Sequence, residues 1–386
     1  MRKILRFGTI TGIILRGVLF PGDLTADSVI LAPYRSQREQ FNIAQVVKDL
    51  ENPWSIAFLP GGEFLVTERR GRLLWISPGG SMREVAGVPK VFSSGQGGLL
   101  DVVLDPDFPV NRQVYFSFSM PGKGGSAGTA VARAVLGTYQ LTNVQVLYEM
   151  EKKTSSGLHF GSRLLFGPDK FLYVSTGERG DRDRAQDLSD TAGKVLRIQP
   201  DGRVPRDNPF VGNRNASPLV FTYGHRNIQG MVLHPETGKI WIHEHGPRGG
   251  DEINILTPGA NYGWPVITYG KEYFGGLSIG EGTHKEGMEQ PILQWTPSIA
   301  PSGMTFYTGN RFPNWKGNLF VGALAGQHLR RIVLSGEKVV EEEVLLHKTL
   351  GRIRDVREGP DGFLYLLTDE RKGGLYRLEP AGVLGK

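Results

Sequence analysis

Short apolar runs alternate with turns rich in Pro, Asp and Gly along most of this chain. In each copy of the pattern an apolar strand enters such a turn, and a second strand of aromatic and β-branched residues follows it. Six copies can be aligned, at residues 56–66, 103–118, 164–174, 231–242, 304–322 and 356–366. An even division of residues 43–380 gives about 56 residues per copy, enough for the four strands and the loops of one propeller blade.

A repeat of this size predicts one closed domain, because such units cannot bury their faces until they form a ring. We therefore expect an all-β fold, a six-bladed β-propeller over residues 43–386. An open pair of β-sandwiches or a β-helix is the alternative, but neither explains a blade-sized repeat. Segments 177–220 and 265–298 exceed the minimal unit, so we expect them to be loops on one face, where propellers bind ligands.

The composition agrees with a β-rich globular protein. Of the 386 residues 39% are hydrophobic, and 53 Gly with 24 Pro indicate many turns rather than long helices. The net charge of +6 is a thin excess without long runs of like charge, so nucleic acid is not implied as a partner. Since there is no Cys, disulfides, zinc thiolate sites, iron–sulfur clusters and thiol nucleophiles are excluded, and redox chemistry would need a bound cofactor.

Residues 1–42 are expected to precede the propeller. Arg2, Lys3 and Arg6 come before the apolar stretch 7–15, an arrangement that resembles a secretory signal. Arg16 interrupts the run and no clean cleavage site follows, the nearest candidate lying at residues 24–26. We expect a periplasmic or secreted protein, with a cytosolic extension as the alternative. The stretch is too short for a membrane span, and residues 21–42 are typical of a polar lead-in.

Loop 223–230 carries the strongest polar cluster of the chain. Arg226, Asn227 and Gln229 offer several donors within four positions, and two glycines let the backbone approach a ligand. Such a loop suits an anionic, planar, oxygen-rich ligand, although a surface ion pair is an equal alternative.

A second polar cluster spans residues 244–254 and is followed by residues 261–264. Carboxylate and backbone carbonyl oxygens in loops of this composition hold hard cations, so calcium is plausible here. The spacing is not that of an EF-hand, and a satisfied polar turn beside a blade strand is the alternative.

His159 lies in a loop rich in Gly and Ser, a placement that suits a general base. Glu178 could orient its imidazole, although a lone loop histidine is more often structural. Arg352 and Arg354 lie two apart on a strand, hence on one face, where they could clamp a carboxylate or phosphate or form salt bridges between blades. Gln96 adds a polar group in another glycine-rich loop.

Taken in order, these motifs resemble the soluble aldose sugar dehydrogenases and glucose dehydrogenases that use pyrroloquinoline quinone (PQQ). The resemblance covers residues 52 to 378 and rests on seven ordered motifs. They are Asn-Pro-Trp-Ser-Ile-Ala-Phe from Asn52, Gly-Gln-Gly-Gly-Leu-Leu from Gly95, His159 before a Gly-Pro-Asp turn, Gly-His-Arg-Asn-x-Gln-Gly from Gly224, His-Gly-Pro-x-x-Gly-Asp-Glu-Ile-Asn from His245, Asn-Tyr-Gly-Trp-Pro from Asn261 and Arg-x-Arg-Asp from Arg352. Walker, Rossmann and nucleophile-elbow signatures are absent from the sequence.

The resemblance implies a propeller that carries PQQ over its central channel and oxidises aldoses at C1 to lactones. By this likeness His159 is the base that takes the anomeric hydroxyl proton while hydride passes to quinone C5, with Glu178 orienting the imidazole and Arg226 stabilising charge on the quinone oxygen. The implied partners are an aldose and an unidentified electron acceptor, for a monomer or a dimer. The implied cofactor contacts are Gln96, His159, Arg226, Asn227, Gln229, Arg352 and Arg354. The implied calcium ligands are Gly246 and Pro247, with Glu252 and Tyr262 for a second, structural ion.

The sequence departs from the family pattern after residue 324. The family carries a lysine that contacts the cofactor, whereas this chain has Ala325, and either Gln327 or Arg330 could substitute for it. Glu178 also stands where the glucose dehydrogenases have an aspartate. A calcium-dependent propeller lactonase and a non-catalytic binding propeller are the alternative functions.

Overall fold

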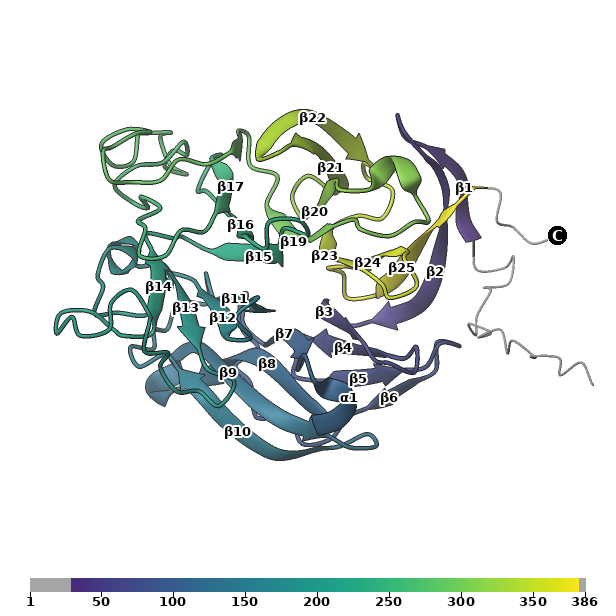
Figure 1. Ribbon diagram of the computed structural model, residues 1–386, viewed down its shortest axis with the longest axis horizontal. Coiled ribbons are helices and arrows are strands. Elements are labelled where there is room, and N and C mark those ends of the chain that lie inside the picture. The colour runs from purple at the N-terminus through teal and green to yellow at the C-terminus, as the bar shows by residue number, and fades with distance from the viewer. Residues whose placement is uncertain (1–28, 382–386) are drawn as a thin grey trace, which may run out of the picture.

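The computed structural model describes residues 29–381, and within them six antiparallel sheets stand side by side in a closed ring (Figure 1). Five sheets have four strands and the sixth has five. The prediction of an all-β, six-bladed β-propeller is confirmed. The signal sequence predicted at the N-terminus lies outside the described residues.

The strands carry almost all of the regular structure. They are β1 (Val29–Arg35), β2 (Gln40–Leu50), β3 (Pro53–Phe58), β4 (Phe64–Glu68), β5 (Leu73–Ile76), β6 (Met82–Glu84), β7 (Leu99–Leu104), β8 (Gln113–Pro121), β9 (Ala127–Leu136), β10 (Leu141–Glu149), β11 (Gly161–Phe166), β12 (Leu172–Thr176), β13 (Lys194–Ile198), β14 (Val220–Tyr223), β15 (Ile228–Leu233), β16 (Ile240–Glu244), β17 (Asp251–Ile255), β18 (Leu293–Trp295), β19 (Pro301–Phe306), β20 (Leu319–Ala323), β21 (His328–Ser335), β22 (Lys338–Leu345), β23 (Ile353–Glu358), β24 (Leu364–Thr368) and β25 (Gly373–Pro380).

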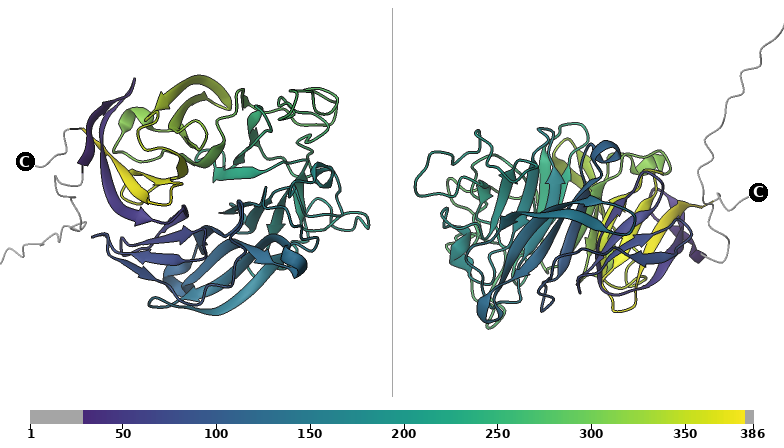
Figure 2. Two further views of the ribbon diagram at one scale, coloured as in Figure 1. Left: turned by 180° about the vertical axis from the view of Figure 1, so that it is seen from behind. Right: turned by 90° about the horizontal axis from the view of Figure 1, so that it is seen from below.

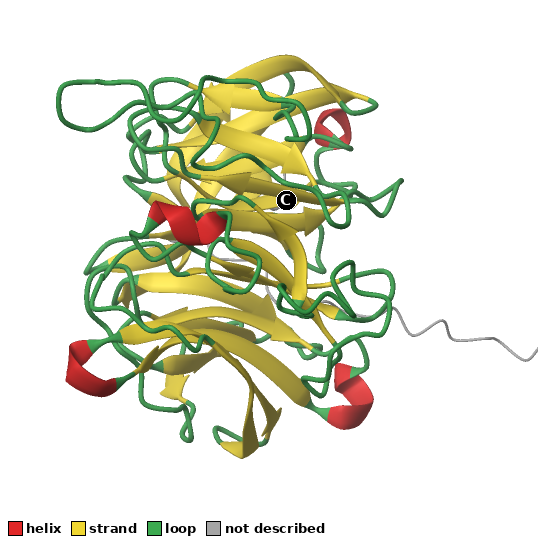
Figure 3. Ribbon diagram, turned by 90° about the vertical axis from the view of Figure 1, so that its left-hand side faces the viewer, coloured by secondary structure: helices red, strands yellow, loops and turns green. Residues whose placement is uncertain are grey.

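Within residues 29–381, helical structure is limited to short turns (Figure 3). They are α1 (Phe108–Asn111), η2 (Lys123–Gly125), η3 (Arg182–Ala185) and η4 (Pro313–Trp315). In the part of the chain that the structure describes, no helix has the length and apolar character that crossing a bilayer requires.

Each predicted repeat forms the two innermost strands of one blade. The innermost strands are β3, β7, β11, β15, β19 and β23, and each contacts the next around the ring, including β23 with β3. The turns between the paired strands explain the Pro-Asp signature. In two of them an aspartate after proline accepts a hydrogen bond from a tyrosine four residues on, Asp169 from Tyr173 at 2.8 Å and Asp361 from Tyr365 at 2.7 Å.

The ring is closed by strands from opposite ends of the chain. β2 pairs with β25 from Phe41 opposite Pro380 to Leu50 opposite Gly373, and β1 pairs with the outer edge of β2. In Figure 1 the purple β2 lies beside the yellow β25. The propeller therefore begins before residue 43, where its start was expected, because residues 29–42 contribute to the last blade.

The hydrophobic core of the described residues consists of six large clusters, one at each interface between neighbouring sheets, and two small ones. For example, Leu65 and Leu73 of the first blade pack in one cluster with Val102 and Phe116 of the second. Since both faces of every sheet are covered, second strands of the blades such as β4, β12 and β20 are buried at every residue. Each blade therefore buries its apolar side chains against its two neighbours.

The innermost strands all begin at one face of the ring, called here the site face, and the strands run between the two faces (Figure 2). The prediction that segments 177–220 and 265–298 are loops on one face is wrong in two respects. Each contains a strand, β13 and β18 respectively. Strand direction places 177–193 at the site face but 199–219 at the opposite face.

Candidate functional site

A cavity of about 310 Å³ opens at the site face over the central channel. It brings together five residues predicted from the sequence to hold a ligand, Gln96, Asn227, Gln229, Arg352 and Arg354. Its volume is at the lower end of small-molecule sites. The other lining residues are Trp54, Arg69, Leu100, Phe160, Gly161, His245, Ala300, Leu324 and Asp369.

Most of these lining residues occupy equivalent positions in their blades. Trp54, Leu100, Gln229 and Arg354 are each the second residue of an innermost strand. Four others directly follow the second strand of a blade, where the chain returns to the site face, and they are Arg69, His245, Leu324 and Asp369. The cavity therefore draws on five blades or more, and its shape depends on the closed ring.

Asp369 organises the arginines of the cavity. One of its carboxylate oxygens lies 2.8 Å from Arg354 and 3.3 Å from Arg352. Burial raises the pKa of Asp369, but Arg354, Arg69 and Arg352 together hold it far below its usual range. Two guanidiniums thus bond to one carboxylate and a third, that of Arg69, faces the same cavity, so the cavity keeps an excess of positive charge that favours an anion.

His159 and Glu178 form a buried pair beside this cavity. His159 Nδ1 lies 2.6 Å from Glu178 Oε1. Burial lowers the pKa of His159, an effect that the hydrogen bond to Glu178 only partly opposes. Burial raises the pKa of Glu178, but the hydrogen bond from His159 and the charge of Arg226 bring it below its usual value. His159 is therefore neutral with Nδ1–H donating to a carboxylate, which leaves the Nε2 lone pair as a base.

The loop around His159 is fixed from several sides. Its backbone N–H donates to Gln96 Oε1 at 2.8 Å, and the N–H of Gly161 donates to Asn227 Oδ1 at 3.0 Å. The buried guanidinium of Arg179 donates to the carbonyls of Leu158 and Ser156. A side chain at Gly177 would clash with the carbonyl of His159, so glycine is required where the two loops meet.

Arg226 lies next to the predicted calcium ligands. Its Nη1 donates to the carbonyl oxygens of His245 at 3.2 Å and Gly246 at 3.0 Å. Its guanidinium also lies 5.4 Å from the ring centre of Trp264, within the range of a cation–π contact. A carbonyl oxygen has two lone pairs, so Gly246 retains one acceptor position for a cation. Pro247 packs against Gly270 of the long loop.

A buried charge network forms the layer beneath the cavity. Arg163 lies 3.0 Å from Asp355 and 3.7 Å from Asp101, and Arg357 lies 3.0 Å from each of the two aspartates. Arg163 also donates to the carbonyl of Gln229 at 2.6 Å and lies 4.2 Å from the ring of Trp54. The network joins three blades across the channel and supports two residues of the cavity.

The candidates for a second calcium ion do not line the cavity. Burial, followed by the charges of Glu244 and Asp251, raises the pKa of Glu252 to about 8. The phenol of Tyr262 donates to the carbonyl of Ile255 at 2.7 Å. Within residues 29–381 no group of three or more His, Asp or Glu side chains is placed to hold a metal ion.

The residues considered as substitutes for the family lysine are not in the cavity. Ala325 is exposed, and neither Gln327 nor Arg330 contributes to the lining. Arg330 Nη1 instead lies 3.7 Å from Glu342 on the neighbouring strand. Arg69, which follows β4, is a further cation that faces the cavity. It was not among the residues predicted from the sequence.

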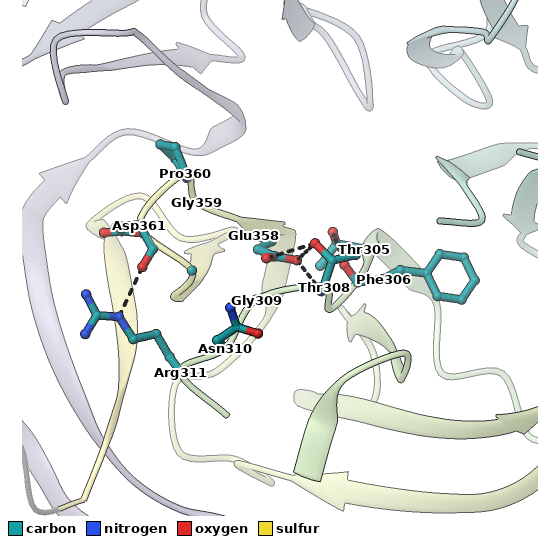
Figure 4. Close-up of a pocket in the computed structure, with 11 residues that line it drawn as sticks. Thr305, Phe306, Thr308, Gly309, Asn310, Arg311, Glu358, Gly359, Pro360 and Asp361 are labelled. Atoms are coloured by element: carbon teal, nitrogen blue, oxygen red, sulfur yellow. Dashed lines mark hydrogen bonds between the residues drawn. The ribbon is translucent and has the colours of Figure 1, made fainter. Parts of the chain in front are cut away.

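A larger hollow of about 810 Å³ lies at the opposite face, between the β19–β20 and β23–β24 connections (Figure 4). Its polar groups bond to one another: Glu358 accepts from the backbone N–H of Thr308 at 2.6 Å, and Arg311 Nε donates to the carbonyl of Asp361 at 3.2 Å. None of the residues predicted for chemistry lines it.

Comparison with known proteins assigns the family. The sequence profile described as Glucose / Sorbosone dehydrogenase matches residues 50–377. Aldose sugar dehydrogenase YliI of Escherichia coli (strain K12) is 43% identical over 344 residues, which cover 88% of this chain and 93% of that protein.

Solved structures agree with this assignment. The soluble aldose sugar dehydrogenase from Escherichia coli, in its apo-form, has a TM-score of 0.86 at 42% identity and covers 88% of this chain and 99% of that one. The PQQ-bound form of aldose sugar dehydrogenase from Streptomyces coelicolor has a TM-score of 0.73 at 30% identity and covers 90% of this chain and 100% of that one. The chain therefore belongs to the glucose/sorbosone dehydrogenase family, as the resemblance of its motifs predicted.

Proposed function

We propose that this protein oxidises aldose sugars at C1 to lactones with bound PQQ and calcium, and that His159 is the general base. The observation that carries the proposal is the buried pair of His159 and Glu178, 2.6 Å apart, directly before Phe160 and Gly161, which line a cavity with an excess of positive charge. A base and an anion-binding cavity side by side are what an oxidation that removes a proton and a hydride requires.

The residues of the cavity fit a planar polycarboxylate such as PQQ. Three arginines and one carboxylate face the cavity, and the Nε atoms of Arg69 and Arg354 are buried without a hydrogen-bond acceptor. Trp54, Leu100 and Phe160 form one apolar cluster along the wall, which suits a flat ring system. Arg352 and Arg354 would hold carboxylates, and Gln96, Asn227 and Gln229 would bind the remaining polar edge.

When bound, the quinone accepts a hydride at its C5 carbon and calcium acts on it as a Lewis acid. His159 Nε2 takes the proton of the anomeric hydroxyl, so that the C1–O bond gains carbonyl character as the C1 hydride leaves. Glu178 keeps the proton of the imidazole on Nδ1 and stabilises the imidazolium that forms. The two electrons then pass to an external acceptor.

Arg226 supplies positive charge where negative charge develops. Its guanidinium is held by the carbonyls of His245 and Gly246, so it needs little reorganisation during the reaction. The carbonyl oxygens of Gly246 and Pro247 would bind the calcium of the site. Glu252, which is half-buried near the carboxylates of Glu244 and Asp251, would bind a second calcium ion together with Tyr262, since a cation would relieve this repulsion.

Reconstitution tests the proposal. The purified protein, freed of metal with a chelator, is supplied with PQQ, calcium or both, and reduction of an artificial electron acceptor is followed with a panel of aldoses. Activity that needs both additions supports the proposal, and failure to oxidise any aldose with both present contradicts it. Export to the periplasm and a monomeric or dimeric state stay predictions, tested by cell fractionation and by light scattering.

A further inference from the structure

Arg69 is a charged residue of the cavity, and neither the sequence motifs nor the chemistry above gives it a role in ligand binding. It directly follows β4 and faces the same cavity as Arg352 and Arg354. Its Nη1 donates to the carbonyl of Gly95 at 2.9 Å, and its Nε is buried without an acceptor. Its backbone is fixed on both sides, because its N–H donates to Asn52 and its carbonyl accepts from Leu99. The guanidinium is thus rigidly presented and only partly satisfied.

The charges around Arg69 are not balanced within the cavity. Asp369 forms its ion pairs with Arg352 and Arg354, and Arg69 forms none with an acidic side chain of the described residues. Three guanidiniums and one carboxylate leave two positive charges in a small, partly buried space. Like charges gathered in this way disfavour one another, and the arrangement is stabilised when an anion is added.

We propose that Arg69 binds a carboxylate of the cofactor as the third guanidinium of a clamp formed with Arg352 and Arg354. The inference rests on the proposed function, since it names PQQ as the polycarboxylate. Asp369 spaces the other two arginines by holding both from one oxygen. Arg69, which makes no such bond, keeps its Nε free for the ligand.

The clamp also accounts for the departure at Ala325. The loop that carries Ala325 presents Leu324 to the cavity, and Arg352 Nη1 donates to the carbonyl of Leu324 at 3.4 Å. That loop therefore supplies no positive charge to the cavity. Arg69, which follows β4 in another blade, supplies one instead. In this chain the cofactor's carboxylates meet arginines alone.

The test measures PQQ binding rather than turnover. Apo-protein with calcium is titrated with PQQ by calorimetry, for the unmodified protein, Arg69→Met and Arg69→Lys. The matched control is Arg70→Met, because Arg70 is the exposed neighbour and pairs with Glu51 at 3.0 Å outside the cavity. We expect Arg69→Met to raise the Kd about 10- to 100-fold, Arg69→Lys to raise it less, and Arg70→Met to leave it within about twofold.

A modified ligand separates binding from a structural effect. PQQ trimethyl ester has no charged carboxylate, so its Kd should differ by less than about twofold between the unmodified protein and Arg69→Met. An equal loss for PQQ and its ester would show that Arg69 only supports the fold and would overturn the inference. A Kd for PQQ unchanged in Arg69→Met would also overturn it.

Failure of the proposed function gives a different result, because then the unmodified protein does not bind PQQ at all. If Arg69→Met does not fold, as circular dichroism would show, Arg69→Lys decides the question. It keeps the charge but cannot form the planar, two-pronged contact. Binding of PQQ by Arg69→Lys as tight as that of the unmodified protein would overturn the inference.

Discussion

His159 Nδ1 and Glu178 Oε1 lie 2.6 Å apart in a buried pair that joins the loop before β11 to the loop after β12. The two loops meet because the paired strands return the chain to the site face. This contact sets the protonation state of the imidazole, since an ionised carboxylate at Nδ1 keeps the proton there and leaves Nε2 unprotonated.

Replacement of Glu178 by Gln should impair catalysis without impairing cofactor binding. The amide cannot stabilise the imidazolium, so we expect kcat to fall about 10³- to 10⁴-fold while the Kd for PQQ changes little. Glu178→Asp, which restores a charge but is one methylene shorter, should recover part of the loss. A kcat within tenfold of the unmodified protein for Glu178→Gln would contradict the orienting role.

The same variant should shift the pH dependence. Glu178 raises the pKa of His159 through its hydrogen bond and its charge, so its removal lowers that pKa further. The base is active when unprotonated, and the acid limb of kcat against pH should therefore move to lower pH in Glu178→Gln. An acid limb that stays in place would show that another group sets it.

Stability should fall as the pH drops below about 6.5, the ordinary pKa of histidine. Burial lowers the pKa of His159, brings that of His328 to about 4 and that of His245 to about 3, so these rings take up protons at lower pH in the folded state than in the unfolded chain. The unfolded chain binds more protons in this window, and stability is lost as pH falls. Thermal unfolding between pH 7 and 4 checks this, and His328→Gln should flatten the dependence by about one proton. If the stability of His328→Gln depends on pH as strongly as that of the unmodified protein, this prediction is contradicted.

Arg163 should be a major determinant of stability. Replacement by Met leaves the buried Asp101 and Asp355 with one guanidinium, that of the partly exposed Arg357, in place of two. Breaking a buried ion pair in this way costs about 3–5 kcal/mol in free energy of unfolding. Denaturant unfolding measures it, with Lys239→Met, which breaks an exposed pair with Glu337, as the control. A loss below about 1 kcal/mol, the range of surface pairs, would contradict the role of the network.

Arg179 should act on catalysis through the position of His159. Its guanidinium bonds two carbonyls of the loop and lies 3.5 Å from the ring of Phe160. Displacement of a catalytic group by about 1 Å costs about 10²-fold in rate, so Arg179→Met should lower kcat by that order. Arg179→Lys, which keeps a donor, should recover part of it. If Arg179→Met lowers only the melting temperature and leaves kcat unchanged, the residue is structural alone.

The fold could be predicted because its repeat unit is encoded locally. Each copy combines an apolar strand, a turn with a fixed chemistry and a second strand, and Asp169 and Asp361 show that the turn residue has the same partner in different blades. The closing strands could not be predicted in the same way. β1 and β2 carry polar residues such as Arg35 and Gln40 because β1 is an outer edge strand, and such a segment reads as a linker.

The site could be predicted best where several polar residues are close together in sequence. Arg226, Asn227 and Gln229 lie within four positions, and four of the five predicted contacts that line the cavity come from closely spaced positions of this kind. Arg69 and Asp369 lie beside other charged residues, such as Arg70 and Glu370, and no motif distinguishes them. The signal that finds them is their place in the repeat, directly after the second strand of a blade.

The most direct test of the central claim is anaerobic reduction of bound PQQ by one equivalent of glucose, followed by absorbance in a stopped-flow instrument. The account predicts that deuterium at C1 slows the reduction by a primary isotope effect, and that His159→Gln binds PQQ but reduces it at least 10³-fold more slowly. Reduction by His159→Gln at the rate of the unmodified protein would contradict the account.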